Sequence, residues 1–112
     1  MAQYLSALDG VFAALADPTR RAVVQHLGRG PASVGELAEP FPITLPSFMK
    51  HVRMLEDSGL IRTAKSGRVR ICTLDQDRVA VVGDWLDEQR QLWEARIDRL
   101  EHLVTDSKEP KR

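Results

Sequence analysis

The chain has 112 residues, of which 43% are hydrophobic and 29% are charged, and its sixteen basic residues balance sixteen acidic ones. This length suits one small domain, and because there is neither an apolar run near the ~20 residues that span a bilayer nor a secretory leader pattern, we expect a cytoplasmic protein that does not bind membranes. A single cysteine, Cys72, excludes an intramolecular disulfide and a multi-cysteine zinc site within one chain.

Two helices are predicted at the N-terminal end of the sequence. The first spans residues 3–16, because its apolar residues recur at the three- and four-residue steps of one helical face: Leu5, Leu8, Phe12 and Leu15. Asp17 and Pro18 then start a second helix, as N-cap and first helical residue, and Gly28 ends it.

Residues 33–58 predict a short helix, a turn and a longer helix, which together make a helix-turn-helix. Ser33 and Glu36 form a capping box at the start of the short helix. The longer helix begins at Thr44, whose hydroxyl can cap it, and Gly59 suits the left-handed position of a Schellman motif at its end. Its predicted core face comprises Phe48, Val52 and Leu55.

A β-hairpin and a long helix complete the predicted fold. Two β-type runs flank Ser66-Gly67, which suits a tight turn, so residues 60–74 form a wing. The last helix is predicted over residues 76–106, with a bend possible near Gly83, and residues 107–112 form a disordered tail. The fold class is therefore mainly α with a β-hairpin (α+β): a winged helix-turn-helix domain over residues 1–106, in the order helix, helix, short helix, helix, strand, strand, helix.

The last helix carries more apolar surface than docking on its own domain requires. One stripe contains Leu86, Trp93, Ile97, Leu100 and Val104, and a second stripe beside it contains Val82, Trp85 and Leu92. A face of this width favours a partner helix from a second chain. The two tryptophans can pack in that interface or line a ligand pocket between subunits, and both interpretations stay open.

Positive charge is concentrated in residues 44–70, which carry a net charge of +4, whereas residues 75–106 carry −5. A local basic surface suits a protein that grips phosphate. With its core face inward, the longer helix would present Leu45, Ser47, Met49, Lys50, His51 and Arg53. Ser47, Lys50 and His51 would then reach base edges in the major groove or nearby phosphates, and Arg53 would reach phosphate. Leu45 or Met49 could contact thymine methyl groups. On the hairpin, Lys65, Arg68 and Arg70 could contact phosphate or the adjacent minor groove.

Four segments resemble the arsenic-repressor (ArsR) family of winged-helix regulators. They are Leu15-Ala-Asp-Pro-Thr-Arg-Arg-Ala-Val-Val, Val34-Gly-Glu-Leu-Ala, Pro46-Ser-Phe-Met-Lys-His-Val-Arg-Met-Leu-Glu-Asp-Ser-Gly-Leu-Ile and Gly67-Arg-Val-Arg. The resemblance covers about residues 5–105. It implies a homodimer built on the first and last helices that binds an imperfect palindrome near a promoter and represses it.

The resemblance also implies which residues do this. By position, the base-reading surface becomes Thr44, Leu45, Ser47, Lys50 and His51, with Arg68 and Arg70 on the wing. The dimer interface becomes Leu5, Leu8 and Phe12 together with Leu86, Trp93, Ile97, Leu100 and Val104.

Two features depart from the family pattern. Many members sense metals through a cysteine pair at the start of the third helix or through ligands on the last helix. Here residues 34–38 contain no cysteine and the last helix has the lone His102, so we expect no metal site and no cofactor. The turn before the longer helix contains Pro40 and Pro42, where the family commonly has glycine, so it should be built differently.

The sequence thus predicts a DNA-binding transcriptional regulator and not an enzyme, because no phosphate loop, nucleophile elbow or paired-carboxylate motif appears. Its expected partners are double-stranded DNA, a second copy of itself and an unknown small-molecule or protein effector. Cys72 can be a redox sensor or a small buried apolar residue. The alternative function is a winged-helix module whose longer helix binds a protein instead of DNA.

Overall fold

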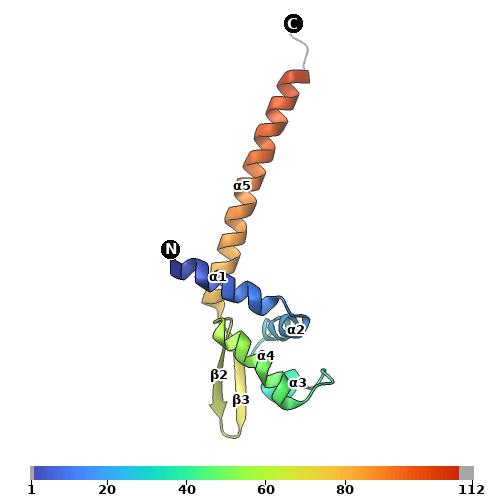
Figure 1. Ribbon diagram of the computed structural model, residues 1–112, viewed down its shortest axis with the longest axis vertical. Helices are drawn as coiled ribbons and strands as arrows, with labels where there is room; N and C mark the ends of the chain where they lie inside the picture. Colours follow the sequence, from blue (N-terminus) through green and yellow to red (C-terminus); the bar gives the residue numbers. More distant parts are fainter. Residues whose placement is uncertain (1, 109–112) are drawn as a thin grey trace. The chain divides into compact units, whose positions relative to one another are not determined.

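A computed structural model describes residues 2–108, with side chains for residues 5–105. Its elements are α1 (Ala2–Leu15), α2 (Pro18–Leu27), β1 (Ala32–Ser33), α3 (Val34–Ala38), α4 (Leu45–Asp57), β2 (Ile61–Ser66), β3 (Val69–Leu74) and α5 (Gln76–Lys108). Figure 1 labels all of them except the short β1. The predicted fold class is confirmed, and β1 is an addition that the sequence did not predict. Where the sequence predicted one domain over residues 1–106, α5 continues past a first compact unit that ends at Ala80 into a second that begins at Val81.

The predicted start signals of the helices are confirmed. The Asp17 carboxylate accepts a hydrogen bond from the Arg20 backbone N–H at 3.0 Å, and Pro18 is the first residue of α2. Ser33 and Glu36 form the capping box of α3: the Ser33 hydroxyl accepts from the Glu36 N–H at 3.1 Å, and the Glu36 carboxylate accepts from the Ser33 N–H at 3.4 Å. These bonds satisfy backbone donors that a helix start otherwise leaves unpaired.

The end of α4 differs in one detail from the predicted Schellman motif. Gly59 has φ +84°, and its N–H donates to the Glu56 carbonyl as the motif requires. The second bond of the motif is relayed by a side chain: the Leu60 N–H donates to the Ser58 hydroxyl at 3.2 Å, which donates to the Leu55 carbonyl at 2.7 Å. The buried Ser58 therefore completes the helix end.

The two strands of the wing, β2 and β3, belong to a three-stranded antiparallel sheet in the order β1-β3-β2. Ser66 pairs with Val69, so the two loop residues are Gly67 and Arg68, one position later than the predicted Ser66-Gly67 turn. Gly67 has φ +66° and Arg68 has no positive φ, which is the φ pattern of a type II′ hairpin turn. β1 adds two residues on the other side of β3, with Ala32 opposite Cys72.

The core lies within the first unit. Phe48, Val52 and Leu55, the predicted core face of α4, are each at most 1% exposed. They pack with apolar residues from the other elements of this unit: Leu8, Val11, Ala14, Val23, Leu27, Ala32, Val34, Leu37, Leu60, Ile61 and Cys72. Leu8 was predicted for the dimer interface, but at 3% exposed it is a core residue of its own chain.

α5 runs as one helix through Gly83 to Lys108, so two residues of the predicted tail are helical, and residues 109–112 lie outside the described chain. Its apolar residues are largely exposed, including Leu86, Leu92, Trp93, Leu100, Leu103 and Val104. Within the described residues, no helix combines the length and apolar character needed to cross a bilayer.

Candidate nucleic-acid interface

The exposed side of α4 carries the cations that the sequence predicted. Because the core face is fully buried, Lys50 and Arg53 lie on the solvent side of the helix, and Leu45 at its start is 56% exposed. Met49 is half-buried on the flank of the helix. An α-helix with this outward face fits the width of a DNA major groove.

The N-terminal end of α4 presents two linked hydroxyls. Thr44 caps the helix, since its Oγ1 accepts from the Ser47 N–H at 3.3 Å, and it donates its own proton to Ser47 Oγ at 3.0 Å. Because Ser47 accepts in this pair, its hydroxyl proton can still be donated to a base or phosphate. The exposed Ser47 is therefore oriented before any ligand arrives.

His51 has partners within the protein. Its Nδ1 lies 3.2 Å from the Arg20 guanidinium and 3.5 Å from the Asp17 carboxylate, and its side chain is 24% exposed. Arginine can only donate, so Nδ1 accepts in the Arg20 bond and the ring proton is then on Nε2. That N–H is the only donor the neutral ring can offer to DNA while the Arg20 bond is present.

Arg20 was not predicted to belong to the site. It is 8% exposed, and its guanidinium donates to the Ala14 carbonyl at 2.7 Å, the Ala13 carbonyl at 3.3 Å and the Met54 sulfur at 3.4 Å, besides contacting His51. It thereby joins the end of α1 to α4. The available signal was its spacing, because Arg20 precedes Val23 and Leu27 on the same helical face of α2.

The wing places two of its three cations, Arg68 and Arg70, along a groove. Arg68 occupies the exposed hairpin turn, and Lys65 and Arg70 face each other across the two strands. A groove of about 410 Å³ lies between the wing, α4 and the start of α3. It is lined by Ser33, Val34, Gly35, Leu45, Met49, Arg68, Val69 and Arg70.

Arg70 is also bonded inside the protein. Its guanidinium donates to the Thr63 hydroxyl at 2.9 Å, and that hydroxyl donates to the Glu56 carboxylate at 2.7 Å. Arg70 was predicted to contact DNA, and neither Thr63 nor Glu56 was predicted to belong to the site. Sequence spacing does not reveal this chain, because it joins β3 to β2 and β2 to α4.

The Cys72 thiol is fully buried, 0% exposed, on β3. Burial raises its pKa, the negative charge of Glu56 raises it further, and Arg70 opposes both. A thiol with a raised pKa has little thiolate and reacts slowly, which favours the packing interpretation over redox sensing. In the part of the chain that is described, no three His, Cys, Asp or Glu side chains come together as a metal-ion cluster.

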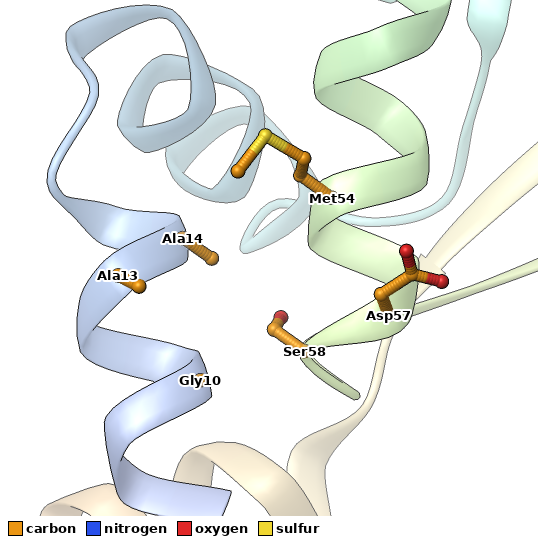
Figure 2. A pocket seen from close by; sticks show the side chains of 6 residues that line it. All are labelled: Gly10, Ala13, Ala14, Met54, Asp57 and Ser58. Atoms are coloured by element: carbon orange, nitrogen blue, oxygen red, sulfur yellow. The ribbon is translucent and has the colours of Figure 1, made fainter.

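A second recess, of about 220 Å³, lies between α1 and α4 (Figure 2). Figure 2 shows small residues of α1, Gly10, Ala13 and Ala14, on one side and Met54, Asp57 and Ser58 on the other. The recess exists because these α1 positions lack long side chains.

Comparison with known proteins identifies the chain. A helix-turn-helix domain family matches residues 15–64. The chain is 38% identical over 79 residues to the HTH-type transcriptional regulator Rv2034 of Mycobacterium tuberculosis, covering 70% of this chain and 74% of that protein. The crystal structure of an ArsR family transcriptional regulator, RHA00566, has 60% identity and a TM-score of 0.74 over 79% of this chain and 97% of that one. The chain belongs to the ArsR family of transcriptional regulators.

The resemblance predicted from the sequence is thus confirmed. This ArsR-family chain is also 34% identical over 61 residues to the transcriptional repressor SdpR of Bacillus subtilis, a match that covers 54% of this chain and 68% of that protein. The helix-turn-helix match contains α2, α3 and α4 completely and ends within β2. Lys65, Arg68 and Arg70 therefore lie just beyond it.

Proposed function

We propose that this ArsR-family regulator is a repressor that binds an imperfect DNA palindrome as a homodimer. In each half-site α4 lies in the major groove and the wing contacts the flank. The observation that carries the proposal is that α4 and the wing both present exposed cations, Lys50 and Arg53 on α4 and Lys65 and Arg68 on the wing. Arg68 also lines the groove between the wing and α4.

The residues divide by the kind of contact they make. Ser47 and Lys50 are proposed to contact base edges, and Leu45 to contact thymine methyl groups, because hydroxyl, ammonium and apolar groups suit those features of the major groove. Thr44 orients Ser47 through their hydrogen bond. Arg53, Lys65 and Arg68 are proposed to contact phosphate. His51 and Arg70 have partners in the protein, so we give them mainly a positioning role.

The homodimer is proposed from the apolar surface that one chain leaves exposed. On α5, Leu86, Trp93, Leu100 and Val104 are 48% to 59% exposed, and Ile97 lies beside them. A hollow of about 310 Å³ along this stripe, lined in part by Ile97, Leu100 and Val104, could receive a side chain of a partner helix. Leu5 and Phe12 of α1, 53% and 38% exposed, are the further proposed members.

Repression follows if this dimer covers promoter DNA. A twofold-symmetric dimer places its two reading helices in successive major grooves on one side of the duplex, and the two wings extend the covered region. The similarity to a protein named as a repressor supports this direction of control. The effector that releases the DNA is proposed to be a small molecule or a protein, and DNA binding itself is proposed to need no metal or cofactor.

Selection of binding sites from random DNA duplexes, followed by a salt titration on the selected site, tests the proposal. We expect enrichment of a palindrome and a linear fall of log K with log salt concentration, because phosphate contacts release counterions. If no sequence is enriched and no binding occurs even at low salt, the protein-binding alternative is favoured.

Two variants refine the assignment of contacts. Arg68→Ala should weaken binding to all sequences alike and reduce the salt slope by about one, since one phosphate contact is lost. Lys50→Ala should instead change which base is preferred at one position of the half-site. A uniform loss for Lys50→Ala, without a change in preference, would reassign Lys50 to phosphate.

A further inference from the structure

We propose that Glu56 and Thr63 are positioning residues for DNA binding: through Arg70 they fix the wing relative to α4. The proposal rests on the proposed DNA-binding function and adds residues that it did not contain. It also gives Arg70 a specific role, which is to brace the wing instead of contacting phosphate.

The direction of the hydrogen bonds is determined by the chemistry of the three groups. A carboxylate only accepts and a guanidinium only donates, whereas a threonine hydroxyl does both. Thr63 therefore gives its single proton to Glu56 at 2.7 Å and accepts from Arg70 at 2.9 Å. Bonds with one charged partner are stronger than bonds between neutral groups.

The chain of bonds spans three elements. Glu56 lies in the last turn of α4, Thr63 in the middle of β2 and Arg70 near the start of β3. Thr63 pairs with Cys72, whose side chain is buried, so Thr63 is on the same sheet face as Cys72 and faces the body of the unit. Arg70, two residues before Cys72, is on that face as well. The hairpin is therefore joined to the reading helix by side chains as well as by the short connection from Asp57 to Ile61.

This chain of hydrogen bonds, the brace, affects DNA binding because the cations of α4 and those of the hairpin must contact the same duplex. Lys50 and Arg53 are on α4, whereas Arg68 is at the tip of the hairpin. A change in the angle between hairpin and helix moves Arg68 away from the phosphate that it should meet when α4 is in the groove. The Arg70 guanidinium shares its surroundings with the Glu56 carboxylate, so it offers DNA less net positive charge than Arg68 does.

The test measures affinity for the selected duplex, the salt slope and urea stability for a set of variants. Thr63→Val removes the hydroxyl at nearly constant shape, Thr63→Ser restores it, and Thr73→Val makes the same change on the opposite face of the hairpin. We expect Thr63→Val to lower affinity about three- to tenfold, as for the loss of one hydrogen bond. Thr63→Ser and Thr73→Val should bind like the unchanged protein.

A double-mutant cycle then tests whether Arg70 and Thr63 act through the same chain of hydrogen bonds. Arg70→Ala should lower affinity to a similar extent with an unchanged salt slope, and the double variant Thr63→Val/Arg70→Ala should bind no more weakly than either single variant. Additive losses, or a salt slope reduced by about one for Arg70→Ala alone, would show an independent phosphate contact and overturn the proposal.

Glu56→Ala distinguishes two possible roles of Glu56, because they predict opposite changes in affinity for DNA. If Glu56 anchors the brace, its removal lowers affinity for the selected site. If it only repels DNA, removing its negative charge raises affinity, and that result would also overturn the proposal. If the unchanged protein selects no DNA sequence, the proposed function fails before the brace is tested, so the two failures are distinguishable.

Discussion

The two compact units of this regulator differ in how far their apolar residues are exposed. In the first unit, fourteen hydrophobic residues from Leu8 to Cys72 are buried, each at most 8% exposed. In the second, the large apolar residues of α5 from Leu86 to Val104 include six that are 48% to 64% exposed. The same residue types thus form a core within one chain in the first unit and a surface in the second. An exposed apolar surface of this kind supports the proposed homodimer.

The largest effect is expected from a charge placed in the α5 stripe. Leu100→Glu would bury a carboxylate in the proposed interface and should raise the dimer dissociation constant by about 30-fold or more. Gln91→Glu is the matched control, because nine residues at ~100° each put Gln91 on the opposite side of the helix. Sedimentation equilibrium measures both. Equal dimer dissociation constants for Leu100→Glu and Gln91→Glu would contradict the proposal that this stripe of α5 forms the dimer interface.

Two glycine-to-alanine substitutions, one in each compact unit, test the role of the glycine backbone through the protein's stability to urea. Gly59 has φ +84°, and a Cβ there would also lie 2.8 Å from the Arg78 guanidinium. That side chain can move, so the backbone cost dominates, and Gly59→Ala should destabilise the protein by roughly 1–2 kcal/mol. Gly83→Ala, in open space on α5, should stabilise it by about 0.5–1 kcal/mol. A Gly59→Ala protein as stable as the original would show that this helix end tolerates another conformation.

Asp17 should give a smaller, pH-dependent effect in the first unit. The Arg20 backbone N–H lowers its pKa below the ordinary 3.8, burial opposes this, and the charges of His51 and Arg20 lower it further. A lowered pKa in the folded state means that the charged form stabilises the fold above about pH 4, and that this contribution is lost as the pH falls through the folded value.

Two substitutions separate the cap from the charge. Asp17→Ala should cost about 1 kcal/mol at neutral pH, as a lost N-cap. Asp17→Asn retains a capping oxygen and should cost less, and its deficit in urea titrations should shrink as the pH falls below about 4 and through the lowered pKa of Asp17. A deficit that is constant from pH 7 to pH 3 would contradict the assigned role of the charge.

The smallest effect is expected from oxidation. Because the Cys72 thiol is buried and its pKa is raised, a thiol reagent should label the native protein far more slowly than the urea-unfolded chain. Mild peroxide should leave DNA affinity unchanged. A loss of affinity in the original protein that is absent from Cys72→Ala would instead assign a redox role to this residue.

Local signals in the sequence predicted the elements and their ends. Asp17, Ser33 and Thr44 cap the helices that they were expected to cap, and Gly59 takes the left-handed conformation, because these features depend on residues a few positions apart. β1 could not be predicted in the same way. Its two residues become a strand only by pairing with Ile71 and Cys72, about forty positions away.

The candidate site was predicted as a surface but not as a set of contacts. Helical periodicity correctly placed Lys50 and Arg53 on the exposed side of α4. It could not show that His51 meets Arg20, 31 residues earlier, or that Arg70 reaches Thr63. Periodicity tells which face of an element a residue occupies, whereas its partner is decided by how elements pack.

The central claim is that two copies of α4 read one operator, and the stoichiometry of the protein–DNA complex tests it most directly. Native mass spectrometry, with affinities measured in parallel, would compare the selected palindrome with a duplex that contains a single half-site. The account predicts two chains on the palindrome and a half-site affinity lower by about 100-fold or more, because the second contact is lost. One chain per duplex, bound equally tightly to palindrome and half-site, would contradict it.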